Sequence, residues 1–203
     1  MEPTAVALAG ATAFARAMRP DLPVVDEGLA ALRRLFAAAA VPYALVGGVA
    51  VIHHGYVRST RDLDLLMQRE DVERLLPHLA ADGFERRQEN RLRHLASHVD
   101  VDLLFAGDPR PRPGAPPYPQ LRDLDRSPHE NDVVGLPGLV ELKLVARRHQ
   151  DVADVVALLK HLDESAYLDL EASLPQRLRR EVLRLRRDAL DELRFENRES
   201  DPR

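Results

Sequence analysis

The spacing of hydrophobic residues divides the first part of the chain into short elements. Between residues 26 and 40, apolar side chains recur every three or four positions, which predicts an amphipathic helix. Residues 43–46 and 63–67 are short apolar runs typical of buried strands. Residues 49–54, which lie between these runs, are expected to form a short helix closed by Gly55.

The next segment is expected to hold one interrupted helix followed by antiparallel strands. Residues 70–81 have a helical pattern, although Pro77 predicts a kink or an early break within it. Residues 84–105 contain neither proline nor glycine, and their pattern favours two or three antiparallel strands. The clearest of these strands is 99–105, where apolar and acidic residues alternate.

The last part of the chain changes from loop to helix. Residues 106–131 are rich in proline, which predicts a long surface loop, and residues 132–135 are expected to add one short strand. From Pro137 onward the pattern is helical, with helices expected at 139–149, 151–161 and 175–195.

These elements indicate an α+β fold, in which a mixed sheet is flanked by helices and followed by a helical C-terminal part. We divide the chain into an N-terminal helical segment at 1–24, a core at 25–136, a C-terminal helical region at 137–195 and a polar, disordered tail at 196–203. Within the first segment, an alanine-rich helix is expected at 1–18.

Composition limits the classes of function. The chain has 203 residues, of which 45% are hydrophobic and 31% charged, as in an ordinary globular protein. Its net charge of -4 argues against a partner held by phosphate neutralisation over a broad surface, although a local basic groove stays open. The absence of cysteine excludes disulfides, thiol nucleophiles and cysteine-bound zinc. Because the N-terminus lacks the charge order of a signal peptide and no stretch approaches a membrane span, we expect a cytoplasmic protein with no membrane partner.

Candidate chemistry begins with two glycines and two aspartates. Gly47 and Gly48 stand where a strand meets a helix, and the free backbone N–H groups at such a junction suit a phosphate group. Asp62 and Asp64 alternate with leucines, which places both carboxylates on one face of a strand. Neighbouring carboxylates repel each other unless a cation lies between them, so the pair predicts a magnesium (or manganese) site shared with substrate phosphates.

A third acid is expected from a neighbouring strand. Asp102 immediately precedes two leucines and is the first choice, and Asp100 is the second. A trio of carboxylates that includes Asp62 and Asp64 supports a two-metal, in-line displacement at phosphorus.

In this arrangement the sequence resembles a known superfamily. Gly-Gly, then Arg-x-Thr-x-Asp-x-Asp at 58–64, then Val-Asp-Leu-Leu at 101–104 are similar to the DNA polymerase beta-type nucleotidyltransferases. Within these, the chain most resembles the minimal bacterial nucleotidyltransferases and the AbiEii-like toxin family. The resemblance covers roughly residues 40–162 and continues through 142–154. Gly48 is a departure, since the family often has Gly-Ser at this pair and a serine hydroxyl for phosphate is then missing.

The resemblance implies roles for further residues. It implies that Thr60 joins the two glycines in holding phosphate, and that Arg58 and Lys143 offset phosphate charge, with Lys143 reaching the triphosphate. It also implies that Arg148 and Asp151 order the nucleotide site or the helix junction, together with Asp154.

Plainer interpretations of the same residues stay open. Lys143 fits an ordinary lysine of an amphipathic helix, and Arg148 with Asp151 fits a helix-end ion pair in which Asp151 caps the next helix. The pairs His53–His54 and His94–His98 invite a metal interpretation, but we favour structural histidines. Acidic residues are interleaved with the arginines of 177–187, so a solvated helix face is favoured there over a nucleic-acid contact.

The sequence therefore predicts a magnesium-dependent enzyme that moves a nucleoside monophosphate from a nucleoside triphosphate to an acceptor hydroxyl. Candidate acceptors are a protein, a transfer RNA and a small molecule. The toxin resemblance favours the first two and leaves room for an antitoxin protein as partner. Two alternatives are an inactive nucleotidyltransferase fold that binds a nucleotide or a partner, and an antibiotic nucleotidyltransferase. The identity of the nucleotide, the oligomeric state and the role of the proline-rich loop are not determined by the sequence.

Overall fold

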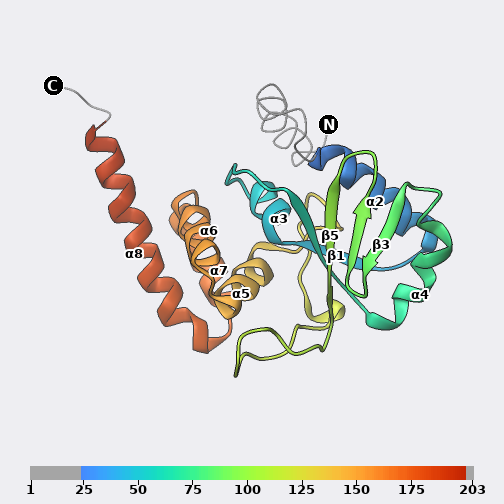
Figure 1. Cartoon of the computed structure of the whole chain (residues 1–203). Coiled ribbons are helices and arrows are strands. Elements are labelled where there is room, and N and C mark those ends of the chain that lie inside the picture. Colours follow the sequence, from blue (N-terminus) through green and yellow to red (C-terminus); the bar gives the residue numbers. More distant parts are fainter. Residues whose placement is uncertain (1–23, 200–203) are drawn as a thin grey trace.

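The computed structural model describes the backbone of residues 24–199 and the side chains of residues 24–196. The predicted helix at 1–18 lies outside the described residues, as do residues 200–203. The described part confirms the α+β prediction, because a mixed sheet lies beside a group of C-terminal helices (Figure 1).

The sheet has five strands in the order β1-β2-β5-β4-β3. Strands β2 and β5 run parallel to each other, whereas every other neighbouring pair is antiparallel. Two or three antiparallel strands were expected at 84–105, and three form there: β3, β4 and β5. The strand bounds are β1 (Tyr43–Val46), β2 (Asp62–Met67), β3 (Phe84–Gln88), β4 (Arg91–His94) and β5 (Val99–Phe105).

Strands β2 and β5 alternate between apolar and acidic residues, and the alternation separates the two faces of the sheet. Successive side chains of a strand point to opposite faces, so one face collects leucines and valines while the other collects carboxylates. The apolar members are almost completely buried, whereas the acidic ones are partly buried or exposed. The apolar set includes Leu63, Leu65, Val101 and Leu103, and the acidic set is Asp62, Asp64, Asp100 and Asp102.

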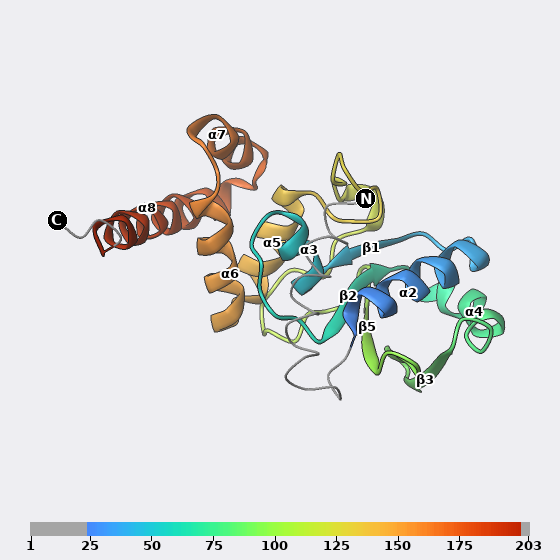
Figure 2. The same cartoon turned by 90° about the horizontal axis from the view of Figure 1, so that it is seen from above.

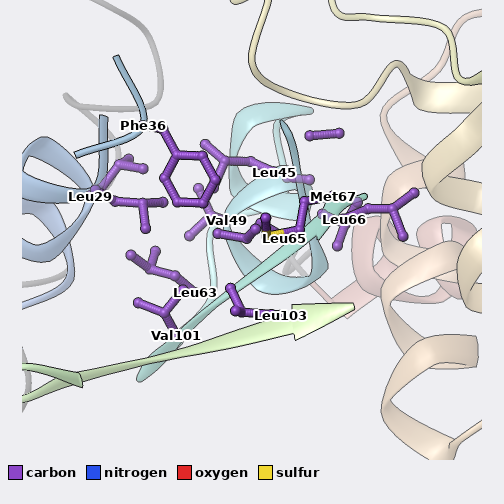
Figure 3. Close-up of a cluster of buried hydrophobic side chains, with 14 of the residues drawn as sticks. Leu29, Phe36, Leu45, Val49, Leu63, Leu65, Leu66, Met67, Val101 and Leu103 are labelled. Atoms are coloured by element: carbon purple, nitrogen blue, oxygen red, sulfur yellow. The ribbon is translucent and has the colours of Figure 1, made fainter. Parts of the chain in front are cut away.

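Helices α2 (Val25–Ala39) and α3 (Gly47–His53) pack on the apolar face, close to where the sequence predicts helices. Figure 3 shows Leu29 and Phe36 of α2 meeting side chains from β1, α3, β2 and β5 in one core. Gly28 lets α2 approach the sheet, because a Cβ atom there would lie 2.9 Å from the Cβ atom of Val99. The core thus fixes β2 and β5 against the helices and leaves their acidic face for other contacts.

The helix expected at 70–81 is interrupted, as Pro77 predicts. The segment forms a 3₁₀ turn at Arg69–Asp71, one α-helical turn α4 at Val72–Leu75 and a second 3₁₀ turn at Leu76–His78. Pro77 lies at the start of the last turn, where its missing N–H group leaves no helical hydrogen bond unmade.

The proline-rich segment 106–131 is a long loop, as predicted, with a single 3₁₀ turn at Leu121–Asp123. The strand expected at 132–135 does not form. Val133 and Val134 make only isolated bridges, to Leu45 and to Arg126. The segment is too short to extend the sheet, because it turns directly into helix α5.

A buried polar network holds the end of this loop against α2 and α3. The guanidinium of Arg33 donates to Glu130 at 2.5 Å and to Asp132 at 2.7 Å. The His53 ring lies 2.6 Å from the Ser127 hydroxyl and 3.6 Å from the Glu130 carboxylate. These contacts give His53 the structural role that its sequence context favours. His54 likewise bonds to a backbone oxygen of the loop, and His94 bonds to Ser97.

Helices α5 to α8 form a second apolar cluster beside the sheet (Figures 1 and 2). Helix α7 was not predicted individually, and its weakly amphipathic sequence explains why. Helix α5 begins and ends three residues before its predicted bounds. It ends at Ala146 because Arg147 adopts the left-handed conformation. The bounds are α5 (Leu136–Ala146), α6 (His149–Lys160), α7 (Glu164–Ser173) and α8 (Gln176–Glu199).

Helix α8 extends beyond the predicted end at 195 and continues to Glu199, so the first residues of the predicted disordered tail are helical. Lys160 of α6 pairs with Glu192 and Glu196 on α8, which stabilises this end of the helix against its neighbour. Among the helices that the structure describes, none combines the length and apolar composition needed to cross a lipid bilayer.

Candidate active site

Gly47 and Gly48 lie at the junction of β1 and α3, as predicted. Other side chains approach both positions so closely that there is no room for a Cβ atom. Gly47 has φ +62°, and a Cβ atom there would lie 2.6 Å from the carboxylate carbon of Asp64. A Cβ atom on Gly48 would lie 2.5 Å from the Thr60 hydroxyl and 3.1 Å from an Arg58 nitrogen. The glycine pair therefore brings the backbone of α3 into contact with the 58–64 segment.

This contact predicts that Gly48→Ser destabilises the protein. The new side chain would occupy space that Thr60 already fills, and overpacking of this kind costs about 1–3 kcal/mol. Ala38→Ser, at an exposed position of α2, is the matched control and should change the free energy of unfolding by no more than about 0.5 kcal/mol. Urea denaturation of both variants measures the difference. Equal midpoints for the two would show that residues 58–60 move aside without cost.

The register of β2 and β5 brings the four candidate acids together. Asp62 lies opposite Asp100, and Asp64 lies opposite Asp102. Since paired residues of neighbouring strands point to the same face, all four carboxylates share one face of the sheet. Asp102 is the direct neighbour of Asp64, and the register therefore favours it over Asp100 as the third acid.

Asp64 is the most perturbed carboxylate of this group. Burial and the negative charges of Asp62 and Asp102 together raise the pKa of Asp64 to about 6, although Arg148 and Lys143 act in the opposite direction. The charged form of a carboxyl group in this environment is stabilised by any cation that comes close to it.

Arginines of β4, which were not among the predicted site residues, hold the two acids of β5. Arg91 donates to both oxygens of Asp102, at 2.6 and 3.2 Å, and Arg93 donates to Asp100 at 2.8 Å. Within residues 24–196, no group of three or more histidine or carboxylate side chains is gathered closely enough to hold a metal ion alone. Arg91 and Arg93 are two residues apart, as Asp100 and Asp102 are, and this shared period is the sequence signal for these cross-strand pairs.

Lys143 and Arg58, both predicted to offset phosphate charge, converge on one buried carboxylate. The ammonium of Lys143 donates to Asp154 at 2.6 Å and lies 3.4 Å from Asp151. Arg58 pairs with Asp154 at 3.0 Å, and Gln150 donates to it at 2.8 Å. Asp154 is completely buried and links the 58–64 segment to α5 and α6.

Arg148 and Asp151 form the helix-end pair that the plainer interpretation describes. The Arg148 guanidinium donates to both oxygens of Asp151, at 2.8 and 3.2 Å. The backbone N–H of Arg148 donates to the same carboxylate at 3.1 Å, so Asp151 caps the start of α6. The capping prediction is confirmed.

A cleft runs along the acidic face beside Asp64. Gly47 and Asp64 form one wall, and Lys143 and Arg148 contribute cations from the helical region. The proline-rich loop contributes Arg110 and Tyr118, which sequence reasoning missed. Their only signal is a tyrosine between two prolines in a segment without other large aromatic residues. Asp62, Asp100 and Asp102 line a separate, neighbouring hollow together with Arg61, Arg91, Arg93 and His98.

The arginines of 177–187 lie on α8 and do not line this cleft. Arg177 pairs with Glu141, Arg184 with Asp188, and Arg186 is buried against backbone oxygens near the end of α6. These contacts support the structural interpretation of that stretch.

A scan against protein-family models found no matching family, and a search of curated proteins found no significant similarity to this chain. The functional assignment therefore depends on the site itself.

Proposed function

We propose that the chain is a metal-dependent nucleotidyltransferase with the polymerase beta-type fold. Within that class, the motifs quoted above resemble most the minimal bacterial nucleotidyltransferases and the AbiEii-like toxins. The reaction would move a nucleoside monophosphate from a nucleoside triphosphate to a hydroxyl group of a protein, an RNA or a small molecule.

The observation that carries the proposal is the position of Asp64. Its carboxylate is partly buried, lies beside two further acids and faces a cleft that also presents cationic side chains. A carboxylate with a purely structural role needs a cationic partner but no neighbouring acids. A site for a metal ion and a polyphosphate needs both, because the acids hold the cation while the basic groups hold the anion.

The donor set fits magnesium. Proteins usually bind this ion through one or two carboxylates, with water and substrate phosphates completing the coordination. Asp62 and Asp64 would supply the carboxylates, with Asp102 as the third. Magnesium bound there would neutralise charge on the transferred phosphoryl group and lower the pKa of the attacking hydroxyl.

The remaining residues would position the substrate. Gly47 and Gly48 keep side chains away from the start of α3, so that phosphate oxygens can approach its backbone. Thr60 donates to Asp62 at 3.2 Å and thereby orients that exposed carboxylate. Arg148 lies at the mouth of the cleft, where its guanidinium can contact an anion while staying bonded to Asp151.

A second candidate is a protein of the same fold that binds a nucleotide or a partner without chemistry. The bidentate bond between Arg91 and Asp102 favours it, because this arginine occupies the carboxylate that a second metal would need. For an active enzyme, Asp102 must exchange Arg91 for the metal.

The test is incubation of the full chain with magnesium and each of the four labelled nucleoside triphosphates, in the presence of cellular protein and RNA. We expect magnesium-dependent incorporation of label into one of these pools. Asp62→Asn and Asp64→Asn should each reduce it to the level without enzyme. Asp163→Asn, which alters only a helix cap distant from the cleft, is the matched control and should keep activity.

If wild type transfers no label but still binds nucleotide in a magnesium-dependent way, the binding protein is the correct alternative. If neither transfer nor such binding occurs, both candidates are wrong.

A further inference from the structure

Arg110 is a buried cation in the wall of the cleft. Only 9% of its surface is exposed, and it is carried by the proline-rich loop rather than by a helix or strand. One of its terminal nitrogens donates to the backbone oxygen of Leu142 at 3.3 Å. Its Nε atom is buried and has no hydrogen-bond partner within the described part of the chain.

The other cations of the cleft differ from Arg110 in their partners. Lys143 and Arg148 are both bonded to carboxylates. Among residues 24–196, no carboxylate forms a salt bridge with Arg110. Burial lowers the pKa of Arg110; the charge of Arg177 acts in the same direction, and Tyr118 and Glu141 offset only part of the effect. Removing a guanidinium from water without an anion is costly, so the fold keeps here a charge that an external anion would stabilise.

Tyr118 fixes the direction of this guanidinium. The Arg110 group lies over the Tyr118 ring, 4.9 Å from its centre, and both residues line the same cleft as Asp64. Stacking on an aromatic face restrains the plane of a guanidinium and leaves its edge free for bidentate bonding.

We propose that Arg110 is an anion-binding residue that receives the polyphosphate of the substrate, with Tyr118 as its positioning residue. The guanidinium fork matches the oxygens of a phosphate group, and the nearby Lys143 and Arg148 suit an anion of several charges. That the anion is a nucleoside triphosphate rests on the proposed function. That Arg110 binds a polyphosphate rests only on its burial, its missing carboxylate and its place in the cleft.

A purely structural role would have Arg110 stabilise the C-terminal end of α5 through the Leu142 oxygen. The same loop offers a matched comparison. Arg112 donates to the Val145 oxygen at 3.1 Å, is exposed and does not line the cleft. Arg112→Gln therefore reports what the loss of such a contact costs, without affecting an anion in the cleft.

The first experiment measures binding of inorganic tripolyphosphate to the full chain by calorimetry, in EDTA so that no metal contributes. We expect wild type to bind, Arg110→Gln to bind at least about 10-fold more weakly, and Arg112→Gln to bind like wild type. Arg110→Lys keeps the charge but not the fork and should fall between them. No binding by wild type, or equal binding by Arg110→Gln, would overturn the inference.

Thermal unfolding without anions separates binding from structure. We expect Arg110→Gln to unfold at or above the wild-type temperature, because it removes a buried charge that has no salt-bridge partner. Tripolyphosphate should raise the unfolding temperature of wild type more than that of the variant. A clear loss of stability in the anion-free variant, with equal stabilisation by tripolyphosphate, would instead show a structural role.

The inference and the proposed function can fail separately. Arg110-dependent binding of tripolyphosphate without any nucleotide transfer would keep the inference and contradict the enzyme. Transfer by wild type with an unchanged KM for the nucleotide in Arg110→Gln would keep the enzyme and contradict the inference.

Discussion

We expect Asp64→Asn to make the metal-free protein more stable at neutral pH, although it should abolish nucleotide transfer. Wild type must keep this carboxylate charged in a partly buried position beside two other acids, and this environment raises its pKa from 3.8 to about 6. At about 1.4 kcal/mol for each pKa unit, the charge costs the folded state up to about 3 kcal/mol at pH 7.5. Asparagine has the same shape and removes that charge.

The effect has a defined dependence on pH. Because the pKa of Asp64 is higher in the folded than in the unfolded chain, protonated Asp64 favours folding below about pH 4, and this advantage is lost as the pH rises through about 6. The stability gained by Asp64→Asn should therefore be largest above pH 7 and disappear near pH 4. Urea denaturation of both proteins between these limits, in EDTA, measures it. A difference that stays constant with pH would show that Asp64 is not the group responsible.

Magnesium and nucleotide should reverse the order of the two proteins. A ligand that binds only the folded state at 100 times its dissociation constant stabilises it by about 2.7 kcal/mol. Wild type should gain this stabilisation, less strongly as the pH falls below about 6, and Asp64→Asn should gain little. Asp123→Asn, which changes an exposed carboxylate in the proline-rich loop, is the control and should follow wild type. Equal stabilisation of all three proteins would place the metal elsewhere.

The alternation of residues in β2 and β5 made much of this site predictable. The alternation of Asp62 and Asp64 with leucines predicts a strand and places both carboxylates on one face of it. The similar alternation around Asp102 predicts a second strand of the same kind. The parallel register that places Asp64 beside Asp102 was not predictable, because it depends on how the chain passes between the two strands.

Residues whose partners are distant in the sequence were harder to predict. The resemblance named Asp154 only beside Arg148 and Asp151, yet Asp154 is completely buried and accepts from three side chains. Arg110 lies in a loop whose prolines prevent any periodic pattern, so only the fold shows that it reaches the cleft. The local sequence pattern predicts which face of a strand or helix a residue occupies and where turns fall. These contacts depend instead on the packing of α5 and α6 beside the sheet.

We expect Asp154→Ala to cause the largest loss of stability of any single change at the site, about 3–5 kcal/mol. Removing one member of a buried ion pair leaves the remaining charge without compensation. Lys143 is 5% exposed and would keep only the longer contact to Asp151, and Arg58 would lose its carboxylate partner. Because Arg58 and Thr60 belong to one segment, that segment should also loosen. Urea denaturation measures the loss, and hydrogen exchange of residues 55–61 measures the loosening.

Two comparisons separate this effect from a general loss of charge. Asp188→Ala breaks an exposed pair with Arg184 on α8 and should cost no more than about 0.5 kcal/mol. Lys143→Met in the Asp154→Ala background removes the uncompensated ammonium and should restore part of the stability, since an apolar replacement of a buried pair is often tolerated. Strictly additive effects of Lys143→Met and Asp154→Ala would contradict this account, because uncoupled residues cannot form the link that holds the 58–64 segment against α6.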